Sequence, residues 1–164
     1  MSFVVPFDGS ELAEAALVRA LEYARALDED VVAVTIVPER TRYAREKGWI
    51  DEDESYAVDA VVEELRGRVV DLAPEADFAF ERIREFPPAE ELAERIERLA
   101  QQHDPSVVFL GSENVGSVVT PVASVAARVA EEEAYDVYIV RHASPSKVGE
   151  LEDHPDFYDG ESAE

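Results

Sequence analysis

The sequence predicts an α/β protein whose parallel sheet is covered by helices on both faces, and three observations carry this prediction. Short apolar runs typical of strands alternate along the chain with stretches whose apolar residues recur at helical spacing. The run VVAVTIV is continuously apolar, as expected for a strand that is covered on both faces. The length of 164 residues and a hydrophobic content of 46% fit one domain with a full core. Strands that alternate with helices form βαβ units, and these build a parallel sheet.

The first half of the chain contains two predicted strands and two predicted helices. The first strand is FVVP (residues 3–6), and Ser10 follows as a good N-cap with Glu11 in the first helical turn. The second strand covers residues 31–37 and leads into a connection that contains Trp49. Apolar stripes define the helices, with Leu12, Ala16, Leu17, Ala20, Leu21, Ala24 and Leu27 in the first and Val58, Val61, Val62, Leu65, Val69 and Leu72 in the second.

The second half continues the alternation with three strands and two helices. Residues 76–83 alternate weakly, which predicts an edge strand, and residues 106–110 form another buried run. The last strand is predicted at residues 135–140. The third helix is predicted from Leu92, Ile96 and Leu99, and the fourth from Val118, Val122, Val125, Ala126 and Val129.

The domain is predicted to span residues 1–142, followed by an acidic tail at residues 143–164. The tail is polar and shows no hydrophobic periodicity, so we expect it to be extended or disordered.

The net charge of −23 is the strongest signal in the composition. Asp and Glu total 38 against 15 Lys and Arg, and the only lysines are Lys47 and Lys147. Carboxylates spread over a whole surface repel one another at ordinary ionic strength, whereas concentrated salt screens them. We therefore interpret the chain as a protein adapted to high salt, of haloarchaeal type; the alternative is an ordinary acidic protein. Such a surface argues against nucleic acid and anionic membranes as partners.

The sequence lacks several features, and their absence excludes some kinds of site and some cellular locations. The absence of cysteine excludes disulfides, thiolate metal sites and cysteine nucleophiles. No apolar run approaches the ~18 residues of a membrane span. The start MSFVVPFDGS has no basic region of the kind that opens a signal peptide. We therefore expect a cytoplasmic protein.

A ligand site is expected where the predicted strands end. In open parallel sheets, ligands bind outside the carboxyl ends of the strands, at the point where the strand order reverses. The segments PFDGS and GSENVGS follow the first and fourth strands, and they meet at that point if these strands are neighbours. The second segment leads into a predicted helix, whose N-terminal N–H groups favour an anion. The sequence thus predicts a nucleotide-sized site.

The chain resembles the universal stress protein family over nearly residues 1–142. The opening VVPFDGSELAEAAL is similar to the strand–Asp–Gly–Ser–helix start of that family. The segment from VVFLGS through ASVAARVAEEEAYDVYIVR is similar to its final strand–loop–helix–strand unit. The resemblance implies a Rossmann-like sheet in the order 3-2-1-4-5, like that of the adenine nucleotide alpha hydrolases. It also implies a homodimer formed through the last strand, residues 135–141.

Members of the family that bind ATP carry Gly, two residues, Gly, nine residues, then Gly followed by Ser or Thr. Gly111 fits the first position, but Asn114 stands at the second and Ala123 at the third, and the spacing to Ser124 is one residue short. Asn tolerates positive φ, whereas the Cβ of Ala123 would crowd a phosphate. The resemblance implies ATP with Mg²⁺ as the ligand, weakly held, with these contacts: Asp8 to adenine or ribose, Ile36 to the base, Gly111, Asn114, Gly116 and Ser117 to phosphates, and Ser124 and Val125 at the helix start.

Several residues near the expected site also have a simpler structural interpretation. Asp8 is an acid near a helix start, Ser10 is more naturally a cap than a ligand, and Gly111 lets the chain leave a strand. The residues Tyr43, Trp49 and Tyr56 flank the connection after the second strand, where they cover the core or form a lid.

No catalytic or metal-binding signature stands out in the sequence. The histidines have no ligand spacing, DEDE is typical of a solvated helix start, and no basic phosphate clamp accompanies the loop after residue 111. The favoured function is a non-enzymatic, dimeric stress-response or regulatory protein that senses ATP or a related nucleotide. The alternatives are a family member that binds no nucleotide and acts through protein contacts, and a nucleotide-using enzyme such as an ATP hydrolase or adenylyl transferase.

Overall fold

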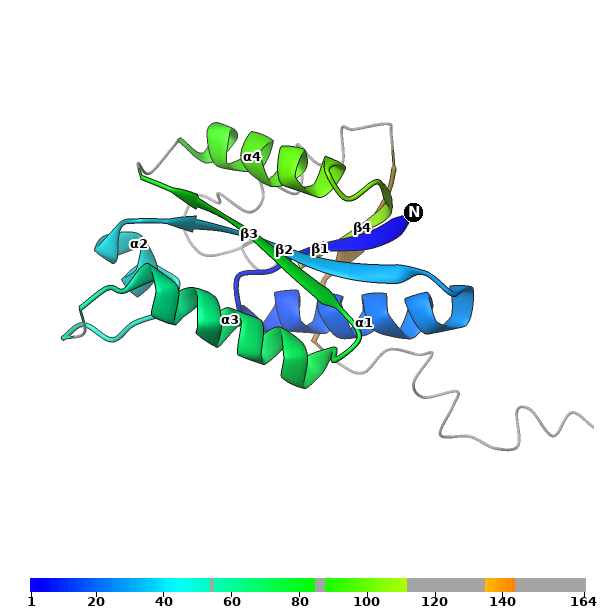
Figure 1. Ribbon diagram of the computed structural model, residues 1–164, viewed down its shortest axis with the longest axis horizontal. Helices are drawn as coiled ribbons and strands as arrows, with labels where there is room; N and C mark the ends of the chain where they lie inside the picture. Colours follow the sequence, from blue (N-terminus) through cyan, green and yellow to red (C-terminus); the bar gives the residue numbers. More distant parts are fainter. Residues whose placement is uncertain (54, 85–87, 112–134, 144–164) are drawn as a thin grey trace, which may run out of the picture.

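A computed structural model of the protein describes residues 1–53, 55–84, 88–111 and 135–143, and its five strands form one parallel sheet (Figure 1). The strand order is β3-β2-β1-β4-β5, as the resemblance implied. The strands are β1 (Ser2–Pro6), β2 (Asp30–Pro38), β3 (Asp77–Ile83), β4 (Pro105–Gly111) and β5 (Asp136–Val140), and the described helices are α1 (Glu11–Leu27), α2 (Thr41–Glu46), α3 (Val58–Leu72) and α4 (Ala89–Gln101). The predicted α/β fold is therefore confirmed.

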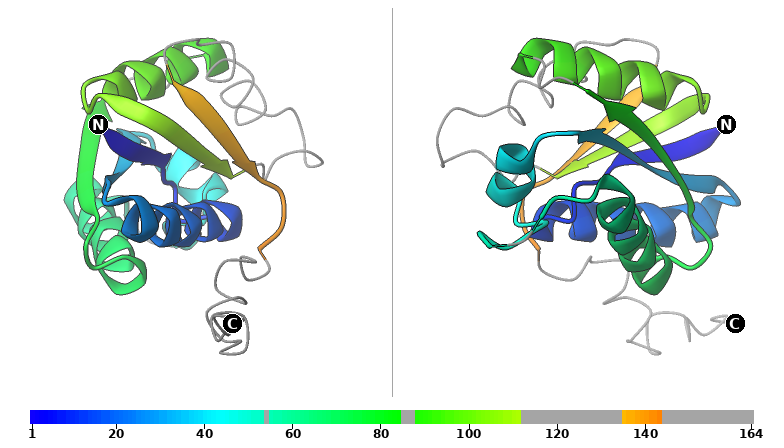
Figure 2. Two further views of the ribbon diagram at one scale, coloured as in Figure 1. Left: turned by 90° about the vertical axis from the view of Figure 1, so that its right-hand side faces the viewer. Right: turned by 60° about the vertical axis from the view of Figure 1, so that its left-hand side comes forward.

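The helices lie on both faces of the sheet, with α1 and α3 on one face and α4 on the other (Figures 1 and 2). Successive side chains of a strand point to opposite faces, so each central strand supplies both sides of the core. Buried side chains on the face of α1 and α3 include Phe3, Val5, Ala33, Val37, Leu17, Leu65 and Val69. Those on the face of α4 include Val4, Val32, Val34, Val108, Leu92 and Leu99. This double burial explains why the sequence of β2 is apolar throughout.

The outer strands are less buried than the inner ones, in accordance with their place in the sheet. In β3 the residues alternate weakly between exposed and half-buried, and Phe80 keeps 37% of its surface exposed. The prediction that this segment is an edge strand is confirmed. At the opposite edge, β5 pairs with β4 and leaves Ile139 39% exposed.

The structure adds one short helix to the predicted element order and does not describe another. The connection after β2 contains a short helix, α2, that the sequence patterns did not indicate, because six residues are too few to show helical periodicity. The predicted fourth helix, around residues 118–129, lies outside the described residues.

None of the helices in the described part of the chain combines the length and apolarity that crossing a bilayer requires.

Candidate functional site

The candidate site lies at the carboxyl end of β1, next to the point between β1 and β4 where the strand order of the sheet reverses. β1 pairs with β2 on one side and with β4 on the other, all in parallel. The chain leaves β1 through Phe7 and Asp8 and enters α1 after the N-cap Ser10. Asp8 comes shortly after β1, and Gly111 is the last residue of the neighbouring β4, so these residues of the two segments that the sequence predicted to meet lie at the same edge of the sheet. This is the position at which doubly wound sheets bind ligands.

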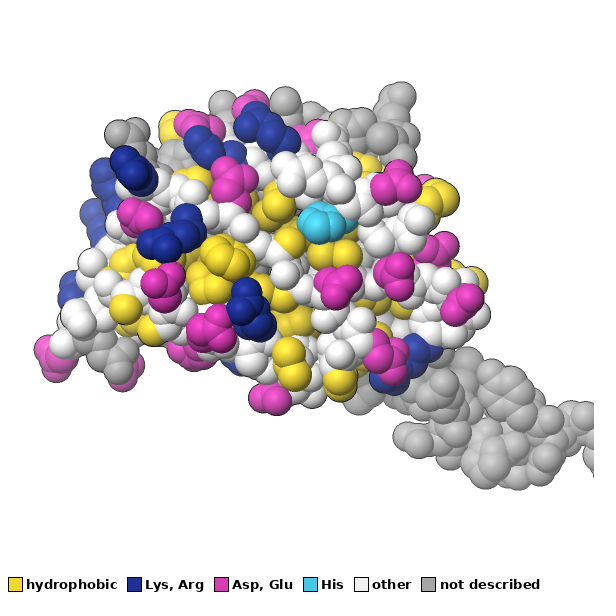
Figure 3. Space-filling view, in the orientation of Figure 1, with side chains coloured by type: hydrophobic (Ala, Val, Ile, Leu, Met, Phe, Trp, Pro, Cys, Tyr) yellow, Lys and Arg dark blue, Asp and Glu magenta, His cyan; other side chains and the backbone are white. Residues whose placement is uncertain are grey.

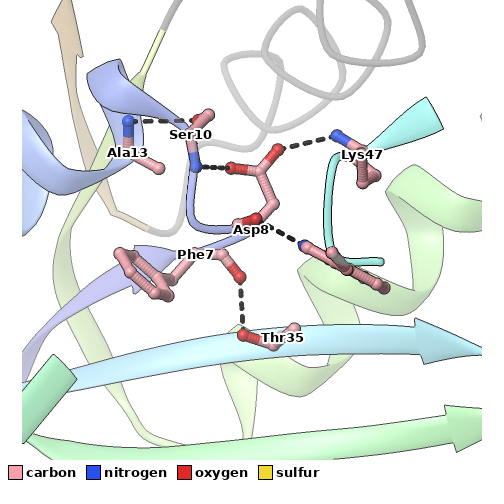
Figure 4. Close-up of polar contacts among 7 residues, drawn as sticks. Phe7, Asp8, Ser10, Ala13, Thr35 and Lys47 are labelled. Atoms are coloured by element: carbon pink, nitrogen blue, oxygen red, sulfur yellow. Dashed lines mark hydrogen bonds and ion pairs between the residues drawn. The ribbon is translucent and has the colours of Figure 1, made fainter. Parts of the chain in front are cut away.

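Asp8 is held by three contacts that fix both its carboxylate and its backbone (Figure 4). The Lys47 ammonium donates to Oδ2 at 2.6 Å, and the backbone N–H of Ser10 donates to Oδ1 at 3.0 Å. The indole N–H of Trp49 donates to the Asp8 carbonyl at 2.8 Å. The Asp8 side chain is 24% exposed and that of Lys47 is 20% exposed, so the ion pair is shielded from much of the solvent without being cut off from it.

These contacts keep Asp8 ionised. Burial raises the pKa of the Asp8 carboxyl, but the positive charge and hydrogen bond of Lys47 and the hydrogen bonds to Ser10 lower it by more. The net result is a pKa below the ordinary value of 3.8. At neutral pH the site therefore presents a carboxylate next to an ammonium.

The backbone around Asp8 is fixed by β2 and by the start of α1. The Phe7 N–H donates to the Val34 carbonyl at 2.8 Å, and the buried hydroxyl of Thr35 donates to the Phe7 carbonyl at 2.6 Å. Gly9 then takes φ +79°, a left-handed conformation that lets the chain turn sharply into the helix. Ser10 caps α1, since its Oγ accepts from the backbone N–H of Ala13 at 3.3 Å. The predicted cap is confirmed.

The α2 segment, residues 40–50, covers one side of this turn. The Tyr43 and Trp49 rings meet edge to face with their centroids 5.4 Å apart, and they are only 8% and 7% exposed. The Tyr56 hydroxyl donates to the Pro38 carbonyl at 2.7 Å. Tyr43 and Trp49 thus cover the core, as expected, and their segment also brings Lys47 to Asp8.

Gly111 lies so close to α1 that a side chain would not fit. A Cβ on Gly111 would stand 2.7 Å from the Leu12 carbonyl carbon, 2.8 Å from the Ala13 nitrogen and 2.9 Å from the Leu12 oxygen. All three are backbone atoms, which cannot rotate away. The close packing of β4 against the first turn of α1 therefore already requires glycine here, with or without a ligand.

Of the remaining candidate residues, Ile36 is buried and the others lie outside the residues that the structure describes. Ile36, near the end of β2, is 5% exposed, and its side chain belongs to the core on the α4 face. Asp8, Ile36 and Gly111 all lie toward the carboxyl ends of their strands. Their roles toward a ligand stay predictions, and the other candidates lie outside the described residues: Asn114, Gly116, Ser117, Ser124 and Val125.

Lys47 is the functional candidate that sequence reasoning missed. It is 39 positions from Asp8 and is the C-cap of a short helix without periodicity, so no motif connects the two. One signal could have pointed to it, because Lys47 is one of only two lysines in a chain whose other 13 basic residues are arginines.

The fold and the site together define a doubly wound α/β domain with a polar centre at the carboxyl edge of its sheet. The chain belongs to the universal stress protein family, whose family model matches residues 1–141. Comparison with curated protein sequences gives no significant match.

Solved structures of universal stress proteins share the fold. One from Burkholderia pseudomallei is 24% identical, with a TM-score of 0.56 over 85% of this chain and 95% of its own. A universal stress protein in complex with cAMP is 21% identical, with a TM-score of 0.55 over 88% and 98% of the two chains. One from Archaeoglobus fulgidus in complex with dAMP is 18% identical, with a TM-score of 0.53 over 86% and 98%.

Proposed function

We propose that the protein is a dimeric, non-enzymatic regulatory member of the universal stress protein family that binds an adenine nucleotide at the carboxyl edge of its sheet. Asp8 faces the nucleoside, and the residues that follow Gly111 face the phosphates. ATP with Mg²⁺ is the ligand that the family resemblance implies, and we expect its affinity to be weakened.

The observation that carries this proposal is the fixed, ionised carboxylate of Asp8 at the point where the strand order reverses. A carboxylate accepts hydrogen bonds from an amino group or from ribose hydroxyls, and its four lone-pair sites exceed the two contacts that Lys47 and Ser10 make. Two similar structures hold cAMP and dAMP, so adenine nucleotides are the first ligands to test.

The sequence of the loop that follows β4 indicates why nucleotide binding should be weak. Asn114 and Ala123 stand where the family motif has glycines, and the loop is one residue short. Gly111 already has a folding role against α1, so its presence does not require a phosphate.

A second candidate is a family member that binds no nucleotide and acts through protein contacts. The ion pair with Lys47 favours it, because the Asp8 carboxylate is already compensated by a cation of the same chain.

Thermal unfolding in concentrated KCl, with and without millimolar ATP, AMP or cAMP and Mg²⁺, separates the two candidates. A ligand at 100 times its Kd stabilises the folded state by about 2.7 kcal/mol, which shifts the midpoint by several degrees. The shift should disappear in Asp8→Asn. It should persist in Glu75→Gln, which removes a carboxylate of a well-exposed ion pair with Arg25. No shift for the wild type with any nucleotide, together with no absorbance from co-purified base, would leave the protein-contact function standing. Turnover of ATP that depends on Asp8 would instead indicate an enzyme.

The proposed dimer has its own test at β5. Ile139 is a large apolar side chain, 39% exposed on this edge strand. Ile139→Glu should convert the dimer to a monomer in sedimentation velocity without loss of helical circular dichroism. A wild-type chain that sediments as a monomer contradicts the dimer.

A further inference from the structure

The α2 segment concentrates positive charge in a strongly acidic protein. Residues 40–47 contain four cations, Arg40, Arg42, Arg45 and Lys47, in a chain of net charge −23. Figure 3 shows the same asymmetry over one face, with Lys and Arg side chains gathered toward the end where α2 and the carboxyl ends of β2 and β3 lie. Lys47 is the cation of this segment that contacts the candidate site.

Hydrogen bonds within the α2 segment and a contact of Trp49 fix the backbone around Lys47. Its N–H donates to the Tyr43 carbonyl at 3.0 Å, and the N–H of Trp49 donates to the Ala44 carbonyl at 2.9 Å. Gly48 makes the turn between them with φ +71°, and the Trp49 indole then bonds the Asp8 carbonyl. The segment is thus attached to Asp8 through Trp49, two residues after Lys47, and the Lys47 ammonium completes the contact through its ion pair.

A site with Asp8 alone would repel the ligands that the family fold favours. The carboxylate is held in its charged form, and a nucleotide phosphate is also negative, so their interaction at close range is unfavourable. The ammonium of Lys47, 2.6 Å from the carboxylate oxygen, cancels that charge. Because the pair is only 20–24% exposed, solvent and salt screen it less than they screen the surrounding surface. The pair of side chains is therefore close to neutral although the protein is highly acidic.

We propose that Lys47 is a specificity-determining residue of this site, which raises the affinity for phosphate-bearing adenine nucleotides relative to the uncharged nucleoside by offsetting the charge of Asp8. The inference rests on the proposed function and names a chemical class of ligand for it. Asp8 serves the nucleoside part, which is common to both ligands, whereas Lys47 acts through charge and so distinguishes them. A lysine suits this role because its flexible stem and three N–H donors serve more than one anion.

The test is titration calorimetry with adenosine, AMP and ATP in KCl for the wild type, Lys47→Met, Lys47→Arg and Arg42→Met. In Lys47→Met, the affinity for AMP should fall about fivefold and that for ATP by at least as much, since one unit charge is lost from the site. The affinity for adenosine, which is uncharged, should stay within about twofold of the wild-type value. Lys47→Arg should keep the wild-type ratio of adenosine to AMP affinity. Arg42→Met is the matched control, because Arg42 lies in the same α2 segment but is 90% exposed and pairs with Glu46. It should leave the ratio unchanged.

A second measurement observes Lys47 in the wild type, so the effect of each ligand is followed without replacing that residue, and a variant serves only for assignment. Reductive ¹³C-methylation retains the charge and labels Lys47, Lys147 and the N-terminus, with Lys47→Arg assigning the Lys47 signal. AMP should move that signal further than adenosine does, since only AMP brings a negative charge near the ammonium. Equal weakening of adenosine and AMP in Lys47→Met, or a Lys47 signal that AMP does not move, overturns the inference alone. Wild-type protein that binds none of the three ligands overturns both this inference and the nucleotide-binding function.

Discussion

Gly111→Ala is the substitution whose effect the structure defines most sharply. The added Cβ would lie 2.7–2.9 Å from three backbone atoms of Leu12 and Ala13, whereas ordinary contacts of a Cβ begin near 3.4 Å. Relief requires the end of β4 and the first turn of α1 to move apart by about 0.7 Å, because no side chain can rotate away. That movement would loosen the packing between the two segments that form the candidate site.

The cost follows from the usual consequences of overpacking. Forcing an extra carbon into a packed interface costs about 1–3 kcal/mol, and the upper part of that range applies because the obstacle is backbone. We therefore expect Gly111→Ala to lower the free energy of unfolding by about 2–3 kcal/mol, or roughly 5–10 °C in the midpoint for a domain of this size.

Urea unfolding followed by far-ultraviolet circular dichroism measures the effect, and Gly67→Ala is the matched control. Gly67 lies within α3, and a Cβ there would meet nothing within 4 Å. Replacing a glycine inside a helix by alanine stabilises it by about 0.5–1 kcal/mol, so the two identical substitutions should have opposite signs. A Gly111→Ala variant within about 0.5 kcal/mol of the wild type would refute the packing explanation. If such a variant had also lost nucleotide binding, the glycine would be needed for a phosphate after all.

Three further substitutions test the surroundings of the site. Asp8→Asn should destabilise the protein at neutral pH. Because the pKa of Asp8 in the folded protein lies below 3.8, the carboxylate stabilises the fold above pH 3.8 and loses this effect as the pH falls through the folded pKa. The difference in unfolding free energy between variant and wild type, measured with urea, should therefore disappear at low pH. A gap that is constant between pH 3 and 7 would contradict this. Burial raises the pKa of Tyr56 to about 12, so its stabilisation is present below pH 10 and is lost as the pH rises toward 12. The pKa values of Tyr23 and Tyr43 are also raised by burial, so ultraviolet titration should show several late-ionising tyrosines, of which Tyr56→Phe removes one. Ser10→Ala should cost about 1 kcal/mol in unfolding free energy through loss of the α1 cap, and an unchanged value would show that solvent replaces the cap fully.

The fold was predictable because its signals are local and repeated. Continuous apolar runs such as residues 31–37 and helical stripes such as that of α1 each report burial, and their alternation determines the architecture. Even the edge position of β3 was visible, since half-exposure weakens the apolar pattern. The short helix α2 was not, because six residues cannot display a period of 3.6.

The site was predictable only in part, because its contacts join positions far apart in the sequence. The place at the carboxyl edge follows from topology alone, and Asp8 and Gly111 lie there, while their roles toward a ligand stay predictions. The ion pair between Asp8 and Lys47 depends on how α2 packs, which no local pattern encodes. The packing of Gly111 against Leu12 likewise becomes visible only when β4 and α1 are placed side by side.

Asp8 and Gly111 differ in what their structural roles imply about function. Packing against α1 fully explains a glycine at position 111, so that residue is expected whether or not a nucleotide binds. Folding explains the Asp8–Lys47 pair less well, because an ion pair that remains partly exposed contributes only about 1 kcal/mol and apolar replacements of shielded pairs are often neutral. In an acidic chain with two lysines, placing one of them 2.6 Å from a carboxylate at the strand switch point gains little stability. Asp8 and Lys47, rather than the glycine, are therefore the residues whose substitution should distinguish a nucleotide-binding protein from one that binds none.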